Sequence, residues 1–491
     1  MIPTASQSAP FQGNDRVLCG IILGVITFWL FAQTTLNIAP DMGRDLGLGA
    51  STMNMAVAIT ALFSGIFIVV VGGLADRVGR VRIVRIGFCL SILGSVLVGL
   101  APAGHLASAL LLTGRALQGL SGACIMPASL ALVKTYWDGA ARQRAISLWS
   151  IGSWGGSGVC ALFGGLVTQS LGWRYIFFAS VLVAVLGLVL MRGTPESRAA
   201  GRETYSFDFA GVITFMIAMV GLQIIMTQGN KLGWTSPAVL VLIAVTLVAG
   251  FLFFRIEGRT SDAFVDFSLF ANPTYTGATV SNFLLNSVAG TLIVSLQLVQ
   301  LGGNMTAQQA GLLTLGYAVA IIAFIRVGER LLQRFGARKP MIWGCVITGL
   351  AILFLSPANL LLTEYKILAI IGYTLFGVGL AFYATPSTDA ALSSLPETQA
   401  GAGSGIYKMA SSLGAAFGVA ISAAIFIALS TGTDSARWME GVITFYGRQD
   451  NLAIRSAAMI ALMFNVFMVA VAILSIMLTV PGGNPRQSIS K

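Results

Sequence analysis

The sequence GGLADRVGRVR at residues 72–82 lies between two long apolar stretches of the chain. Its glycines permit a tight turn where two helices approach each other closely. The carboxylate of Asp76 is suited to accept hydrogen bonds from the N-terminus of a neighbouring helix, or to pair with an arginine. We therefore predict that Asp76, Arg77 and Arg80 form a latch between two helical bundles. The alternative is a basic loop that only sets membrane orientation.

The rest of the chain has the composition of a membrane protein. Hydrophobic residues make up 56% of its 491 residues and charged residues 10%, against about 25% charged residues in an average soluble domain. The apolar residues form blocks long enough to cross a bilayer, which takes about 20 helical residues. We predict an all-α membrane protein with fourteen transmembrane helices, at residues 17–38, 53–73, 83–101, 106–133, 145–168, 174–192, 209–228, 236–255, 275–300, 308–327, 341–357, 366–387, 402–429 and 457–480.

The basic residues predict the orientation of these helices. Twenty of the 29 lysines and arginines fall in segments on the side of the N-terminus, seven on the other side and two within spans. The positive-inside rule therefore places both termini in the cytoplasm. Because this placement accounts for the net charge of +11, no nucleic-acid partner is predicted. The five cysteines all lie in apolar segments and there is one histidine, so no metal site or cofactor is predicted.

The two halves of the sequence repeat weakly. Residues 74–79 and 331–336, Pro127 and Pro386, and Gly156 and Gly414 form three pairs with offsets of 257, 259 and 258 positions. Related halves around a central path are a known plan of transporters. We predict two six-helix bundles, at residues 1–194 and 271–491, joined by residues 195–270 with a linker and two additional helices.

Several charged residues are candidates for gating or proton coupling. Arg115 lies inside a span, where an arginine either faces a functional path or makes a structural hydrogen bond to helix ends. Lys408 is expected to snorkel outward, to pair with Asp389 or to meet an anionic substrate. A proton carrier needs a carboxylate that titrates near neutral pH, and no acid lies at the centre of a predicted span. The candidate carboxylates are Asp76, Glu329 and Asp389 on the cytoplasmic side and Asp41 at the outer edge.

These motifs resemble the major facilitator superfamily. Residues 72–81 are similar to its loop signature G-x-L-A-D-R-x-G-R-K, with Val81 at the last position, and residues 115–119 match its R-x-x-Q-G pattern. Longer strings resemble the NorB-type quinolone and multidrug efflux pumps of the fourteen-helix drug:proton antiporter family. They are residues 24–33, 119–129, 149–160, 275–286, 289–294, 326–329, 383–389 and 405–420.

The resemblance implies proton-coupled export of amphipathic drugs, such as quinolones and quaternary ammonium compounds, across a bacterial cytoplasmic membrane. It also ties Arg115 to proton coupling. Aromatic and amide side chains on the span faces are compatible with an adaptable drug pocket, although ordinary helix packing is the alternative for each. The candidates are Phe28, Phe31, Gln33, Trp149, Trp154, Asn282, Phe283, Asn286, Tyr317, Tyr383 and Tyr407.

Other functions remain open from the sequence. The alternative is transport by the same fold of a specific metabolite, or of an organic anion drawn by Arg115 and Lys408. A membrane enzyme would need a catalytic cluster and a channel would need repeated polar rings, and neither pattern is visible in the sequence. A monomer working in a lipid bilayer is expected. Residues 430–455 form a long outside loop that is either partly ordered or involved in gating.

Overall fold

The computed structural model describes residues 11–199, 208–259, 267–430 and 443–482. Parts of the predicted linker and of the outside loop, including Trp438, lie outside these residues, as do both chain ends. The cytoplasmic position of the termini and the division of the chain at residues 194 and 270 stay predictions.

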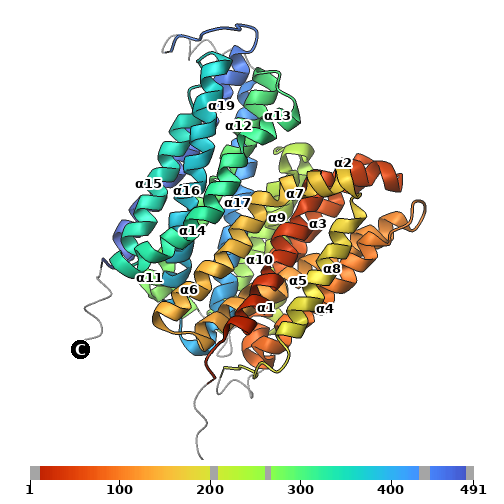
Figure 1. The fold of residues 1–491 in the computed structure, drawn as a ribbon, viewed down its shortest axis with the longest axis vertical. Helices are drawn as coiled ribbons and strands as arrows, with labels where there is room; N and C mark the ends of the chain where they lie inside the picture. The colour runs from red at the N-terminus through yellow and green to blue at the C-terminus, as the bar shows by residue number, and fades with distance from the viewer. Residues whose placement is uncertain (1–10, 200–207, 260–266, 431–442, 483–491) are drawn as a thin grey trace, which may run out of the picture.

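The first half of the chain folds into one bundle of helices (Figure 1). Among the described residues of this bundle, two spans are interrupted by π-helical turns, which often mark functional sites. Its elements are α1 (Asp15–Ile26), η1 (Thr27–Ala32), α2 (Gln33–Leu46), α3 (Ala50–Val78), α4 (Arg80–Gly99), α5 (Ala107–Tyr136), α6 (Gly139–Ser150), η2 (Ile151–Gly155), α7 (Gly156–Ser170) and α8 (Arg174–Leu190).

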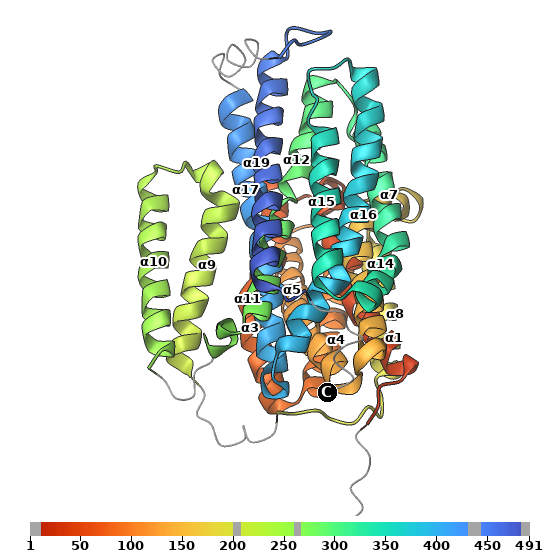
Figure 2. The same ribbon diagram turned by 90° about the vertical axis from the view of Figure 1, so that its left-hand side faces the viewer.

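The last part of the chain forms a second bundle (Figure 1). Its elements are η3 (Phe267–Ala271), α11 (Pro273–Ser287), α12 (Gly290–Gln297), η4 (Leu298–Gly302), α13 (Ala307–Leu313), α14 (Leu315–Phe335), α15 (Arg338–Leu355), α16 (Leu362–Ser394), η5 (Glu397–Gln399), α17 (Ala400–Ser430) and α19 (Leu452–Thr479). Between the bundles in sequence come α9 (Phe209–Leu232) and α10 (Pro237–Glu257). They stand beside both bundles, where α9 contacts α3 and α17 (Figure 2).

The helices agree with the predicted membrane spans. Within the described residues, eleven helices are long and apolar enough to cross a membrane, and the bent run from α6 to α7 makes a twelfth. Residues 174–190 and 209–222 are shorter apolar helices. Together these helices coincide with all fourteen segments predicted from the sequence, so the all-α fold of a multi-pass membrane protein is confirmed.

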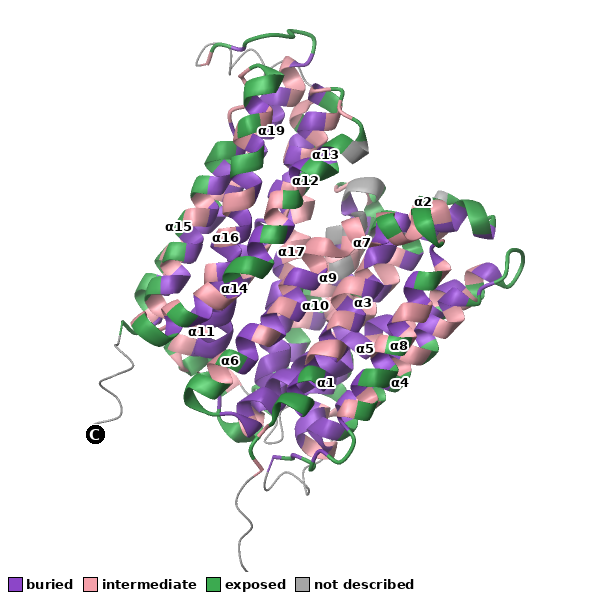
Figure 3. Ribbon diagram, viewed as in Figure 1, coloured by how far each residue is buried: buried purple, intermediate pink, exposed green. Residues whose placement is uncertain are grey.

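Buried and exposed residues divide along each helix (Figure 3). The main core runs through both bundles and includes large side chains such as Phe88, Trp149, Tyr373 and Phe376. The outer faces carry exposed leucine, valine and phenylalanine side chains, above all on α10. Exposed apolar side chains are what a lipid-facing surface requires.

Glycines end helices at matching places in the two halves. Gly79 has a φ of +129° and separates α3 from α4, and Gly336 has a φ of +75° and ends α14. Positive φ is accessible to glycine at little cost. The two glycines are 257 positions apart, which is the offset of the predicted repeat.

Candidate functional site

The two bundles meet at the end of the molecule where α3 turns into α4, which we call the latched end. Here α3 of the first bundle packs against the start of α17 of the second (Figure 2). A Cβ atom on Gly72 would lie 2.5 Å from the carbonyl oxygen of Gly401. Only glycine therefore allows the two backbones to approach this closely.

Asp76 joins the two bundles at this contact. Its carboxylate is fully buried and accepts hydrogen bonds from the backbone N–H of Gly401, at 2.9 Å, and of Ala402, at 3.0 Å. These N–H groups belong to the first turn of α17, where the helix dipole favours a negative charge by up to about 2 kcal/mol in a partly buried geometry. The predicted hydrogen bonding of Asp76 to a helix N-terminus is confirmed, while its role in transport stays a prediction.

Arg80 supports the same contact from the start of α4. Its guanidinium is buried, pairs with Asp76 at 2.8 Å and donates to the carbonyl oxygen of Glu397 at 2.6 Å. It also donates to the hydroxyl groups of Thr135 and Ser197. Removing one partner of such a buried pair typically costs about 3–5 kcal/mol, because the other charge is left uncompensated. Arg77, the third predicted residue, is half-buried on the adjacent turn.

A second set of contacts closes the latched end between α5, α6 and α16. The ammonium group of Lys134 donates to the carbonyl oxygen of Leu392 at 2.7 Å, near the C-terminus of α16. Asp389 pairs with Arg142 at 3.2 Å and accepts a hydrogen bond from Gln143 at 3.4 Å. Both α6 residues belong to the first bundle and Asp389 to the second. Asp389 is therefore a buried carboxylate whose charge directly contributes to holding the bundles together.

The corresponding region of α14 is arranged differently. Glu329 is buried and forms an ion pair with Arg326 of its own helix, and Gln333 donates to it at 3.3 Å. These contacts lie within one helix rather than between the bundles. Asp41, the candidate at the outer edge, pairs with exposed Arg44 of its own helix.

Arg115 lies inside the first bundle. It donates to the carbonyl oxygens of Ala56 at 3.0 Å and Ala32 at 2.9 Å, and to the side chain of Gln118 at 2.6 Å. These bonds tie α5 to α3 and to η1. Arg115 thus makes structural hydrogen bonds to neighbouring helices, which was one of the two interpretations of its sequence position. These contacts do not test a role in proton coupling.

A cavity of about 270 Å³, which we call the central cavity, lies between the two bundles. One wall comes from η1, η2 and α7 of the first bundle and the other from α11, α12, α14, α16 and α17 of the second. Its lining residues are Trp29, Ser153, Trp154, Ser157, Leu285, Asn286, Val288, Ala289, Leu292, Tyr317, Phe376, Leu380, Lys408, Ser411, Ser412 and Ala415.

Lys408 is the charged residue of this lining. It is 6% exposed, and its ammonium group lies 4.4 Å from the centre of the Trp149 ring, which belongs to the first bundle. The indole N–H of Trp149 donates to Ser129 at 2.9 Å, which fixes the ring. A cation over an aromatic face gains about 0.5–2 kcal/mol. Among the described residues, no carboxylate forms an ion pair with Lys408, and its side chain is buried, so neither pairing with Asp389 nor snorkelling outward is seen in this conformation.

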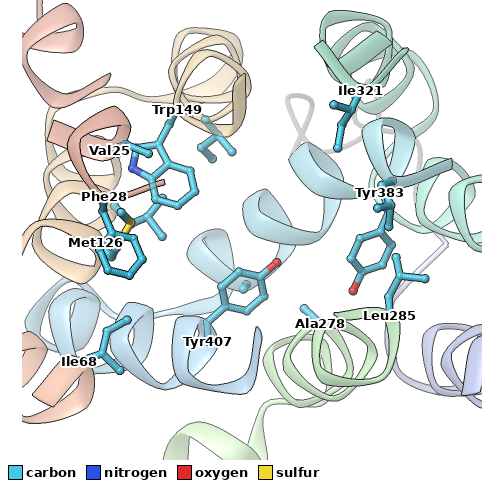
Figure 4. Close-up of a cluster of buried hydrophobic side chains, with 14 of the residues drawn as sticks. Val25, Phe28, Ile68, Met126, Trp149, Ala278, Leu285, Ile321, Tyr383 and Tyr407 are labelled. Carbon is cyan, nitrogen blue, oxygen red and sulfur yellow. The ribbon is translucent and has the colours of Figure 1, made fainter. Parts of the chain in front are cut away.

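The predicted drug-contacting residues divide into two groups. Trp154, Asn286 and Tyr317 line the central cavity, while Trp149 and Asn282 contact residues that line it. The others do not line it: Tyr383 and Tyr407 are buried in a hydroxyl network with Ser281, Ser387 and Thr388. Figure 4 shows these tyrosines on the second bundle, with Phe28 beside Trp149 on the first.

Of the remaining three candidates, Phe31 and Phe283 pack against other helices. Phe31 packs edge to face on Phe163, Phe283 packs on Phe417, and Gln33 is half-buried. For Phe28, Phe31, Gln33, Phe283, Tyr383 and Tyr407, contact with a ligand in the central cavity is therefore not supported in this conformation.

Comparison with known proteins places the chain in a family. The sequence model of the Major Facilitator Superfamily matches residues 21–418. The chain belongs to this superfamily. The quinolone resistance proteins NorB of Staphylococcus aureus strains MRSA252 and COL are each 45% identical to it over 477 residues, covering 97% of this chain and 98% of those proteins.

Solved structures show the superfamily fold at lower identity. The proton:xylose symporter XylE, bound to 6-bromo-6-deoxy-D-glucose, superposes with a TM-score of 0.63 at 16% identity, covering 97% of this chain and 99% of that one. The human organic anion transporter MFSD10 (TETRAN) gives a TM-score of 0.59 at 14% identity, covering 93% and 98%. At these identities the likeness concerns the fold alone.

Several site residues of this superfamily member escaped the sequence analysis. Lys134 and Arg142 were counted only as topology signals, although both cross between the bundles. Trp29 and Phe376 of the central cavity were not singled out. The offset of 257 would have found Trp29, because it is the counterpart of Asn286. The pairing of Arg142 with Asp389 has no comparable signal in the sequence.

Proposed function

We propose that this protein is a secondary active multidrug exporter in the cytoplasmic membrane of a bacterium. It exchanges external protons for cytoplasmic amphipathic drugs, such as quinolones and quaternary ammonium compounds, by alternating access. The observation that carries the proposal is the central cavity between the two bundles. At the latched end, ionic and hydrogen-bonded contacts join the two bundles. The name of the 45% identical NorB proteins supports the quinolone substrates.

We propose that the latched end faces the cytoplasm. It holds Arg77, Arg80, Lys134 and Arg142, as the positive-inside rule expects of the cytoplasmic side. Asp15, at the start of α1, pairs with Arg144 of α6 at 3.1 Å, which brings the N-terminal helix to the same end. The structure then represents a state closed to the cytoplasm, with both termini cytoplasmic. One chain supplies both walls of the cavity, so we propose that the monomer is the transport unit.

Asp389 is the proposed proton-binding group, and Asp76 the proposed latch. A proton on Asp389 would remove the charge that holds Arg142, and so weaken the contact between α16 and α6. Asp76, by contrast, is held by backbone N–H groups and Arg80, all of which favour its charged form. Protonation from outside would thus favour opening toward the cytoplasm, where the proton leaves and a drug binds.

One proton for each drug molecule provides enough energy to export a drug without net charge, such as a zwitterionic quinolone. A charge crossing 100 mV is worth about 2.3 kcal/mol. Since about 1.4 kcal/mol corresponds to a tenfold ratio, a single exchange supports a gradient of roughly 50-fold for such a drug, before any pH difference is added. For a drug with one positive charge the one-for-one exchange moves no net charge, so the pH difference alone drives its export.

The direct test is a resistance panel. The protein is expressed in a bacterium that lacks its own drug pumps, and inhibitory concentrations of quinolones and quaternary amines are measured. Raised resistance is expected relative to the Asp389→Asn variant expressed at the same level. Unchanged resistance across the panel would contradict drug export.

A second candidate is transport of a specific metabolite or organic anion by the same fold. The lysine in the central cavity is the observation that favours it. It would be supported if the panel shows no resistance while proteoliposomes containing the protein accumulate organic anions in response to a pH gradient.

A further inference from the structure

The central cavity carries a positive charge without a negative one. Among the described residues that line it, Lys408 is basic and none is acidic. An exporter selective for cations would be expected to offer a carboxylate to its substrate, as electrostatic complementarity requires. The charge of this cavity therefore indicates that the site recognises an anionic group on the substrate. This inference rests on the proposed function and concerns which drugs the site prefers.

Two buried carboxylates of the second bundle already have basic partners. Asp389 pairs with Arg142 of α6, and Glu329 pairs with Arg326 of α14. Lys408 instead rests on the ring of Trp149 across the interface. An ammonium group that is buried without a counter-ion is costly, and a ring face compensates only part of this cost. A bound anion would supply the rest.

A second hydrogen-bond donor accompanies Lys408. The indole nitrogen of Trp29 is buried and has no hydrogen-bond partner among the described residues. Trp29 lines the same cavity from the first bundle, whereas Lys408 lines it from the second. A buried N–H without a partner costs free energy until an acceptor arrives. Lys408 therefore offers a charged donor to a ligand that carries oxygen acceptors, and Trp29 adds a buried N–H that has no acceptor among the described residues.

Aromatic side chains form much of the remaining wall. Trp154 comes from the first bundle, while Tyr317 and Phe376 pack edge to face at 5.7 Å on the second. Such rings favour planar aromatic ligands through stacking. The cavity of about 270 Å³ is close to the lower end of the usual range for small-molecule pockets, about 300–1,000 Å³.

We propose that Lys408 recognises the carboxylate of planar aromatic acids, such as the acid group of a quinolone. Permanently cationic amphipathic drugs occupy the same cavity without pairing with Lys408. Lys408 is therefore a specificity-determining residue that distinguishes these two classes of drug.

The test compares two ligands that differ in one charge. Binding of ciprofloxacin and of its methyl ester is measured on purified wild-type protein and on the Lys408→Gln and Lys408→Arg variants. Loss of a charge-assisted hydrogen bond predicts that Lys408→Gln binds the acid about tenfold to a hundredfold more weakly. The ester is expected to change by less than about twofold, since its interactions do not involve the lysine charge. Lys408→Arg should keep most of the preference for the acid.

An independent variant tests the same claim from α11, on the same wall of the cavity as Lys408. Asn286→Asp adds a carboxylate to the lining that contains Lys408. It should weaken binding of the acid and strengthen binding of the ester, because the cavity now contains its own counter-ion. Equal changes for acid and ester in both variants, or no change in either, would overturn the proposal.

Transport measurements separate this inference from the proposed function. If wild-type protein exports neither ciprofloxacin nor the tetraphenylphosphonium cation, the proposed function fails. If it exports both and Lys408→Gln reduces both equally, only the recognition of the carboxylate fails. Selective loss of ciprofloxacin export with retained export of the cation supports both.

Discussion

At the latched end, Asp76 accepts hydrogen bonds from the first turn of α17 in the other bundle. Its counterpart 257 positions later is Gln333, which donates to Glu329 within its own helix. The same comparison holds in the central cavity, where Trp29 and Trp154 of the first half correspond to Asn286 and Ser411 of the second. Matching positions of the two halves thus carry different chemistry: the first half has the Asp76 carboxylate and two tryptophans, where the second has amide and hydroxyl side chains.

The two halves of the chain therefore contribute unequally to the contacts at the latched end and to the lining of the central cavity. At the latched end, the carboxylates that reach between the bundles are Asp76 and Asp389. Glu329, although equally buried, pairs within α14. Substitutions of residues that contact the other bundle should therefore have larger effects than substitutions of residues that do not, and four sets of variants compare such positions.

The largest difference is expected between Asp76→Asn and Gln333→Asn. Loss of a buried charge pair costs about 3–5 kcal/mol, so Asp76→Asn should lower drug export by about a hundredfold. Gln333→Asn should change it by less than about threefold, since its hydrogen bond lies within one helix. Export is measured by drug accumulation in cells at matched expression, and equal losses in the two variants would contradict the asymmetry.

The next comparison concerns Asp389→Asn and Glu329→Gln. Asp389→Asn cannot take up a proton, so proton-driven drug accumulation in vesicles should fall at least about tenfold. Exchange of labelled for unlabelled drug, which needs no net proton movement, should persist. Glu329→Gln should retain both activities to within about threefold, as a group outside the coupling step does. Proton-driven accumulation by Asp389→Asn at the wild-type rate would exclude Asp389 as the carrier.

A smaller effect is expected from close helix contacts. In Gly72→Ala the new Cβ would meet the Gly401 carbonyl oxygen at 2.5 Å, and backbone does not yield easily. Overpacking of this kind costs about 1–3 kcal/mol, which predicts roughly a tenfold loss of export. In Gly155→Ala the nearest atom belongs to the side chain of Ile322, at 2.9 Å, and Gly65→Ala meets nothing within 4 Å. Export should be highest in Gly65→Ala, lower in Gly155→Ala and lowest in Gly72→Ala. Any other order would argue against a tight contact of α3 with α17.

The smallest effect is expected in the central cavity. Trp154→Ala removes an aromatic wall worth about 1 kcal/mol to a stacked ring, so quinolone binding should weaken about fivefold. Ser411→Ala, at the matching position, should weaken it by less than about twofold, because a neutral hydrogen bond contributes little net energy. Fluorescence titration of the purified variants provides the measurement. A larger loss for Ser411→Ala would contradict the claim that Trp154 contributes more than Ser411 to quinolone binding.

Much of the fold was predictable because hydropathy and membrane thickness determine helix positions directly. Each of the fourteen predicted spans coincides with helical residues, and the glycine, acid and arginine order around Asp76 predicted its hydrogen bonds. The π-helical turns η1, η2 and η4 were not predicted. They depend on how each helix packs against its neighbours, which no local pattern of residues records.

The faces of the helices were less predictable. In a membrane both the lipid-facing and the buried side of a helix are apolar, so the pattern of residues does not reveal which side faces a cavity. Tyr383 and Tyr407 were therefore expected to contact drugs, yet they bond to hydroxyl groups within the second bundle. The partner of Lys408 was also missed, because Trp149 lies on the other bundle, 259 positions away.

Release of protons from energised vesicles is the most direct test of drug:proton antiport by this protein. Inverted membrane vesicles that contain the protein are energised to store protons, and a quinolone is then added. Drug:proton antiport predicts an immediate rise of the internal pH in wild-type vesicles and no response in vesicles containing Asp389→Asn. No pH response in wild-type vesicles, with a quinolone whose transport has been demonstrated, would contradict proton-coupled export.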